Sequence, residues 1–115
     1  MNYDLLVHMD KEDQNTMDIA LGNIENFMLA LPNETFRVVL VANGAAVKLF
    51  KKANFSAAAT VARLHEKGAQ FKLCANSLKK FAIPAEELVD GCEAIQAGIL
   101  ELVKLQQEGF AYVKP

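Results

Sequence analysis

Residues Phe36–Ala42, FRVVLVA, followed directly by Asn43-Gly44, decide the fold that this sequence predicts. After Arg37 the run is apolar at every position, so an extended segment here would bury both of its faces. Short continuous apolar runs that end at a turn dipeptide are typical of strands covered on both sides. We therefore expect a central strand of a parallel sheet with helices packed on both faces.

The segments on either side alternate in the same way between strand and helix. Four further strands are expected from short apolar or alternating runs, at Tyr3–Met9, 69–74, Cys92–Ile95 and 110–113. Apolar residues at three- and four-residue steps predict helices between them: one capped by Asn15 and ended by Pro32, one capped by Ser56 and ended by Gly68, and one over about 97–108. This order predicts an α/β fold, a three-layer α/β/α sandwich with a mostly parallel five-stranded sheet and right-handed crossovers.

The composition excludes several classes of partner. The chain has 115 residues, of which 52% are hydrophobic and 23% charged, as expected for one globular domain. Its net charge is -2 and its Lys and Arg residues are scattered, so neither nucleic acid nor an anionic membrane is an expected partner. The start MNYDLLVHMDKED is unlike a signal peptide, and no segment approaches transmembrane length. We expect a cytoplasmic protein.

The two cysteines carry the main chemical prediction. Cys74 and Cys92 match neither a CxxC motif nor a zinc-like spacing, so both are expected as free thiols in a reducing compartment. Cys74 ends a predicted strand at the point where the helical segment ANSLKKF begins. A helix start favours the thiolate, which is the nucleophilic form. We predict Cys74 as the reactive residue; the alternative is a small buried side chain that fills the strand end.

Other polar residues are expected at the same carboxyl edge, where open parallel sheets bind ligands. They are His8, Asn43, Gly44 and Asn76. His8 could hydrogen-bond a ligand, help to deprotonate Cys74, or only satisfy a loop. Cys92 could serve as a resolving thiol if folding brings it close to Cys74, with plain packing as the alternative. No carboxylate pair, Ser-His-Asp grouping or histidine-rich ligand set is readable, so we expect no metal and no cofactor.

The segment after Asn43-Gly44 predicts an oligomer. Its sequence, AAVKLFKKANF, is too long for a two-residue hairpin and indicates a short helix or an irregular lid. The apolar part AAVKLF is expected to expose hydrophobic surface that needs cover. A homo-oligomer would supply that cover.

Three stretches, VVLVANGAAVKLF, GAQFKLCANSLKKF and GILELVKLQQEGFAYVKP, resemble the short, single-domain branch of the DsrE/DsrF-like family of sulfur-metabolism proteins. The most specific features are Cys74 followed by Ala75-Asn76, the terminal LQQEGFAYVKP, and His8 at the end of the first strand. The resemblance spans nearly the whole chain and implies one domain over residues 1–115, a three-layer fold, and homo-oligomers, commonly trimers or hexamers. It also implies a role in sulfur relay, with sulfur donor and acceptor proteins as partners.

These observations support three interpretations of function. The first is a sulfurtransferase-like carrier, in which Cys74 accepts sulfane sulfur as a persulfide and passes it to a partner thiol. The second is a non-catalytic small-ligand-binding or adaptor oligomer, in which Cys74 only lines the pocket. The third is a thiol redox sensor, which requires the Cα atoms of Cys74 and Cys92 to lie within about 7 Å.

Overall fold

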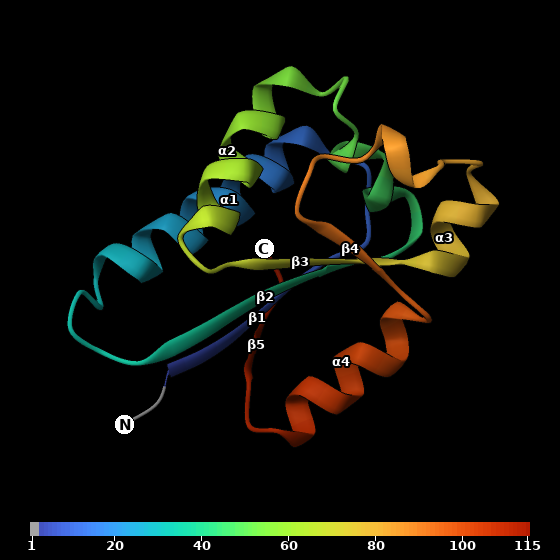
Figure 1. The fold of residues 1–115 in the computed structure, drawn as a ribbon. Coiled ribbons are helices and arrows are strands. Elements are labelled where there is room, and N and C mark those ends of the chain that lie inside the picture. The colour runs from blue at the N-terminus through green and yellow to red at the C-terminus, as the bar shows by residue number, and fades with distance from the viewer. Residues whose placement is uncertain (1–2) are drawn as a thin grey trace.

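The computed structural model describes residues 3–115 and contains a five-stranded sheet in which every strand pair is parallel (Figure 1). The strand order is β4-β3-β2-β1-β5, so β2 is central, as its apolar run predicts. The elements in chain order are β1 (Tyr3–Met9), α1 (Gln14–Leu29), β2 (Phe36–Ala42), η1 (Gly44–Phe50), α2 (Phe55–Glu66), β3 (Gln70–Cys74), α3 (Ala75–Lys80), η2 (Ala85–Glu87), β4 (Cys92–Ile95), α4 (Gly98–Gln107) and β5 (Ala111–Val113). The predicted α/β fold is confirmed, with a sheet that is fully rather than mostly parallel.

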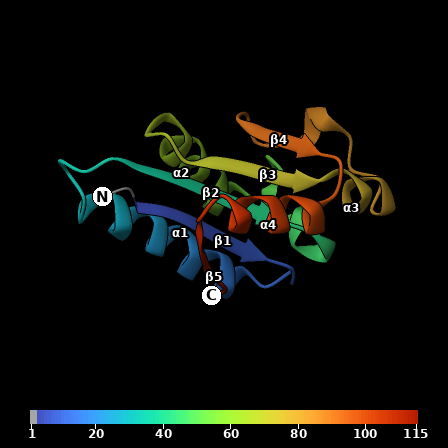
Figure 2. The same cartoon turned by 90° about the horizontal axis from the view of Figure 1, so that it is seen from below.

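The helices form a layer on each face of the sheet. Helices α1 and α2 cover one face, and α4 covers the other (Figure 1 and Figure 2). The larger core lies on the α1 and α2 side, where side chains such as Val7 and Leu40 from the strands pack with Ile24 and Val61 from the helices. Alternation along each strand sends the neighbouring side chains to the opposite face.

The face covered by α4 carries a smaller core. It consists of Leu6, Val39, Val41, Leu102, Leu105 and Phe110. Because this layer has a single ten-residue helix, its outer side keeps apolar residues in contact with solvent. Ile99, Leu100 and Val103 are 67%, 49% and 46% exposed.

Two predicted helix caps are each wrong by two positions. Asp13, not Asn15, caps α1, because its carboxylate accepts the backbone N–H of Asn15 at 3.0 Å. Helix α2 begins at Phe55 with Asn54 as its N-cap residue, and Ser56 lies within its first turn. The Asn54 side chain is held by the preceding turn, where it donates to the Leu49 carbonyl at 2.8 Å. Several residues able to cap stand close together at both sites, and contacts outside the helix decide between them.

The expectation that the segment after Gly44 exposes apolar surface is also wrong. This segment forms the 3-10 helix η1, and its apolar side chains Ala46, Val47, Leu49 and Phe50 are buried in the larger core. Phe50 packs against Phe71 of β3, with ring centroids 6.1 Å apart. The apolar surface that remains uncovered lies on α4 instead.

Candidate functional site

The carboxyl ends of the parallel strands bring the predicted polar residues to one edge of the sheet. His8 lies near the end of β1, Asn43 and Gly44 follow β2, and Cys74 ends β3. The first residue of α4, Gly98, reaches the same edge from the opposite layer. This is the edge at which open parallel sheets place ligands and reactive groups.

Cys74 is both the last residue of β3 and the N-cap residue of α3. The strand leaves it in an extended conformation, with φ -66° and ψ 117°, while the next residue begins the helix. Its side chain faces the α4 layer, because its neighbour Leu73 is in the opposite core. Only 6% of Cys74 is exposed in the single chain.

Neutral donors surround the sulfur and favour its ionised form. Burial raises the pKa of the Cys74 thiol, but the Ser77 hydroxyl and the backbone N–H groups of Gly98, Ser77 and Asn76 outweigh it and bring the pKa below its ordinary value of 9.0. Two of these N–H groups belong to the first turn of α3 and one begins α4. N–H groups at helix starts have no partner within their own helix, so they are available to a thiolate.

Ser77 connects the thiol to the turn after β2. Its hydroxyl oxygen accepts the backbone N–H of Gly44 at 2.8 Å, which leaves the hydroxyl proton free to point at Cys74. Gly44 has φ +60°, and a Cβ there would lie 3.0 Å from the carbonyl oxygen of Asp10. Glycine is therefore required for the turn that presents this N–H to Ser77.

Gly98 allows α4 to approach the thiol. A Cβ at position 98 would lie 3.0 Å from the Asn43 Cβ and 3.3 Å from the Cys74 Cβ. Both distances are shorter than comfortable carbon contacts, which are about 3.5–4.0 Å. A residue without a side chain lets the start of α4, with its free N–H, rest directly against the cysteine.

His8 forms a buried hydrogen-bonded group beside this contact. The side chain of His8 is held by Asn43 Oδ1 at 2.8 Å from Nε2 and by the Tyr112 hydroxyl at 2.6 Å from Nδ1. Because the amide oxygen of Asn43 only accepts, Nε2 carries the proton and Nδ1 accepts from Tyr112 in neutral His8. Both ring nitrogens are thus occupied, and neither is directed at Cys74 as a base. The geometry gives His8 a supporting position.

Asn76 and Cys92 occupy different positions from those of the other candidates. The Asn76 side chain is exposed, and only its backbone N–H serves the thiol. In the register of β3 and β4, Cys92 stands opposite Phe71, whereas Cys74 stands opposite Ile95. Three residues of strand, about 10 Å, therefore separate the two thiols along the sheet, and their side chains face opposite layers. Burial, with a smaller effect of Asp90, raises the pKa of Cys92 to about 12.

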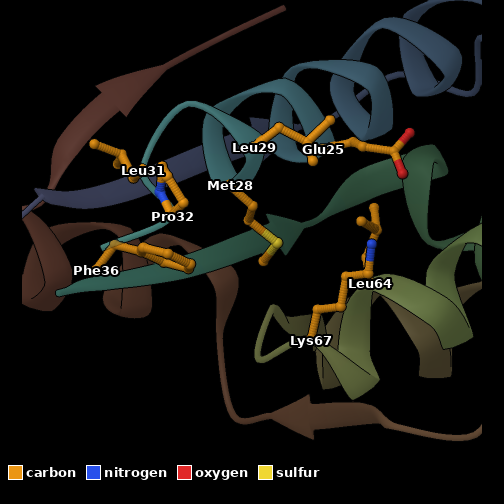
Figure 3. A pocket seen from close by; sticks show the side chains of 8 residues that line it. All are labelled: Glu25, Met28, Leu29, Leu31, Pro32, Phe36, Leu64 and Lys67. Atoms are coloured by element: carbon orange, nitrogen blue, oxygen red, sulfur yellow. The ribbon is translucent and has the colours of Figure 1, made fainter. Parts of the chain in front are cut away.

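Two pockets lie at opposite edges of the sheet. A pocket of about 160 Å³ beside His8 is lined by polar groups that include Asp10, Lys11 and Lys114. A larger one, of about 230 Å³, lies where α1 ends and β2 begins, and Figure 3 shows its mostly apolar lining with Glu25 and Lys67 at the rim. The larger pocket is at the amino edge of the sheet, away from the thiol. Within residues 3–115, no cluster of three or more His, Cys, Asp or Glu side chains could hold a metal ion.

Sequence reasoning missed three residues of this site. Ser77 had a local signal, because a hydroxyl three residues after an N-cap position lies in the first helical turn beside the capping side chain. Gly98 and Tyr112 had none, since they come from α4 and β5 and meet the site only through the packing of the layers.

A fully parallel α/β sandwich with one thiol whose pKa is lowered by neutral donors, at the carboxyl edge of its sheet, defines a small thiol-bearing α/β protein. The sequence model of the DsrE/DsrF-like family matches residues 7–115, and the chain belongs to this family, which is associated with sulfur relay.

Two solved structures share this fold. A protein of unknown function from Methanobacterium thermoautotrophicum, MTH1491, is similar with 26% sequence identity and a TM-score of 0.90, over 98% of this chain and 99% of that chain. A conserved protein of unknown function from Bacteroides thetaiotaomicron, BT1422, shares the fold with 13% identity and a TM-score of 0.78, over 97% and 94% of the two chains. No curated protein matches significantly. In the described part of the chain, no helix has both the length and the apolar character needed to cross a membrane.

Proposed function

We propose that this chain is a cytoplasmic sulfur carrier in which Cys74 accepts sulfane sulfur as a persulfide and passes it to a partner thiol. The observation that carries the proposal is the ring of neutral donors, from Ser77, Asn76 and Gly98, that lowers the pKa of the Cys74 thiol in spite of its burial. A thiolate attacks sulfur far faster than a thiol does. Membership of a family associated with sulfur relay supports the same assignment.

The proposed transfer conserves atoms and electrons. The Cys74 thiolate attacks the sulfane sulfur of a donor persulfide R–S–SH, the donor S–S bond breaks, and R–S⁻ leaves as a thiolate while Cys74 becomes Cys–S–SH. A partner thiolate then attacks the outer sulfur of Cys74, and the Cys74 thiolate is released. No external oxidant or reductant is consumed, because each thiolate that attacks is matched by one that leaves.

The burial of Cys74 favours slender donors. With 6% of the residue exposed, a polysulfide, or thiosulfate with sulfite as its leaving group, fits the approach better than a bulky persulfide. Once loaded, the persulfide carries its reactive atom about 2 Å further out along the new S–S bond. Delivery to a partner thiol is thereby easier than direct attack on the buried sulfur itself.

We also propose that the protein functions as a homo-oligomer, a trimer or a hexamer. The support for an oligomer is the outer side of α4, where Ile99, Leu100 and Val103 are exposed, and not the segment after Gly44. These side chains lie next to Gly98, the first residue of the helix, which contacts Cys74. A parallel sheet is normally covered fully on both faces, and one short helix covers this face only in part. A second copy would complete the layer and adjoin the carrier site.

The redox-sensor alternative receives no support from the register of β3 and β4. A bond between Cys74 and Cys92 needs Cα atoms within about 7 Å, whereas three residues of strand and opposite faces separate the two thiols. The ligand-binding alternative keeps one observation in its favour, the polar pocket of about 160 Å³ beside His8. The two proposals differ in what they require of Cys74: a sulfur carrier needs its sulfur atom, whereas a ligand-binding protein does not.

Intact-mass spectrometry tests the carrier proposal. Reduced protein is incubated with polysulfide or thiosulfate, alongside Cys74→Ser and, as the matched control, Cys92→Ser. We expect additions of one sulfur atom to the wild type and to Cys92→Ser, reversed by a thiol reductant, and none to Cys74→Ser. Equal addition to Cys74→Ser, or no addition with any donor, would reject the carrier function and leave the ligand-binding alternative.

A further inference from the structure

A chain of hydrogen-bonded side chains runs from the edge of the sheet into the site. The Tyr112 hydroxyl of β5 donates to His8 Nδ1 at 2.6 Å, and His8 Nε2 donates to Asn43 Oδ1 at 2.8 Å. His8 is only 8% exposed, whereas Tyr112 is 41% exposed. These two hydrogen bonds thus connect a solvent-facing edge strand, β5, to the interior of the carboxyl edge of the sheet.

Asn43 connects these hydrogen bonds to the thiol site because it contacts Gly98, the first residue of α4. The Asn43 Cβ lies 3.0 Å from the position a Cβ would take on Gly98, so the two residues are in close contact. The Asn43 backbone is fixed as well, because its N–H donates to the Met9 carbonyl at 3.0 Å. The start of α4 therefore packs against Asn43, whose Cβ is placed by this fixed backbone and whose Cγ, 3.7 Å from the same position on Gly98, is oriented by the hydrogen bond to His8.

We propose that Tyr112, His8 and Asn43 are positioning residues for the carrier site. They hold the start of α4 in place, and with it the Gly98 N–H that faces the sulfur of Cys74. The inference rests on the proposed function only in taking Cys74 as the reacting group. His8 acts here through its neighbours, since both of its ring nitrogens are engaged.

Charged groups near the Tyr112, His8 and Asn43 side chains are largely paired. Asp10 and Lys114 form an ion pair at 3.0 Å in the pocket beside His8, and Lys114 is the main cause that lowers the pKa of Asp10. Lys11 lies in the same pocket. Because the Asp10 pair is partly exposed, its field is weakened by solvent, and a change in thiol reactivity on mutation of Tyr112 would come from geometry.

The rate of alkylation by iodoacetamide, measured against pH, tests the inference without any sulfur donor. Below pH 9 this rate reports Cys74, because the pKa of Cys92 is about 12. Tyr112→Phe removes only the hydroxyl, while His8→Asn keeps an acceptor near Nδ1 and His8→Gln keeps a donor near Nε2. Tyr3→Phe, at the other end of β1, is the matched control for the tyrosine.

We expect Tyr112→Phe and His8→Asn to raise the pKa of Cys74 by about half a unit to one unit, with a roughly threefold to tenfold slower alkylation at neutral pH. His8→Gln, which retains the bond to Asn43, is expected to recover most of the wild-type profile, and Tyr3→Phe to keep all of it. Unchanged pH profiles in folded Tyr112→Phe and His8→Asn would overturn the inference. If these profiles shift but Cys74 takes up no sulfane sulfur, the positioning role stands and the carrier function falls.

Discussion

Ser77→Ala is the most direct test of how the site ionises its thiol. The Ser77 hydroxyl accepts the Gly44 N–H at 2.8 Å and is the strongest of the groups that lower the pKa of Cys74. A hydrogen bond to a charged group contributes about 1.5–3 kcal/mol, and sulfur, as a weak acceptor, falls at the lower end. Since one pKa unit corresponds to about 1.4 kcal/mol, the variant should raise the pKa of Cys74 by about one unit.

The sign of the effect follows from the two states of the thiol. The hydroxyl stabilises the thiolate, so its loss favours the protonated form and lowers the thiolate fraction at neutral pH about tenfold. The midpoint of the pH profile for iodoacetamide alkylation measures this directly. Ser77→Thr, which keeps the hydroxyl, should restore the midpoint, and Ser56→Ala, the other serine-to-alanine change in the chain, should leave it unchanged.

The same variant affects stability by a separate route. Without the hydroxyl oxygen, the part-buried Gly44 N–H loses its acceptor, which costs about 1 kcal/mol and a few degrees of thermal midpoint. A folded Ser77→Ala protein with a lower thermal midpoint but an unchanged alkylation profile would refute the reasoning. Ser77 would then only tie the turn after β2 to α3.

Three further predictions concern packing, linkage and assembly. In urea unfolding, Gly98→Ala should destabilise the fold by about 1–3 kcal/mol, because a Cβ there would lie 3.0 Å from the Asn43 Cβ. The control Gly22→Ala, in an open position of α1, should be neutral or stabilising by up to about 1 kcal/mol, and equal effects of the two changes would contradict the close approach of α4. Above pH 9 the unfolded Cys92 thiol ionises while the native thiol, with its raised pKa, stays protonated, so the free energy of unfolding falls as the pH rises, by about 1.4 kcal/mol at pH 10. Calorimetry of Cys92→Val should lack this loss. Ile99→Lys should yield monomers in light scattering while Leu29→Lys, at an equally exposed site, should not; a monomeric wild type would reject the oligomer.

Much of the fold could be predicted because its strands are short apolar runs with clear ends. The bounds of β1, β2 and β4 agree with the sequence expectation residue by residue. Hydrophobic periodicity could not predict the burial of η1. Nearly every residue from Ala45 to Phe50 is apolar, so the pattern does not reveal which side faces the core. Burial of that segment depends on contacts with β3 and α2, which are distant in sequence.

The candidate site was predictable only where it is local. Cys74 and the turn at Asn43-Gly44 follow from strand ends, which a parallel sheet gathers at one edge. The Ser77 and Asn76 donors are local to Cys74, but the contacts that hold the surrounding groups in place join residues 30 or more positions apart, such as Gly44 with Ser77 and His8 with Asn43. No local pattern encodes these pairs, because the packing of α4 and η1 against the sheet creates them.

The use of neutral donors has a consequence for the chemistry of Cys74. Screening by salt acts on exposed charges, so a thiolate held by Ser77 and backbone N–H groups should keep its reactivity across ionic strength, unlike one paired with an exposed lysine. Burial opposes these donors, and the opposition limits how far the pKa falls. A limited fall suits a carrier, because nucleophilicity declines with the pKa and the best attacking thiol has a pKa near ambient pH. The buried position of Cys74 therefore preserves the reactivity of the thiolate that the two helix starts favour.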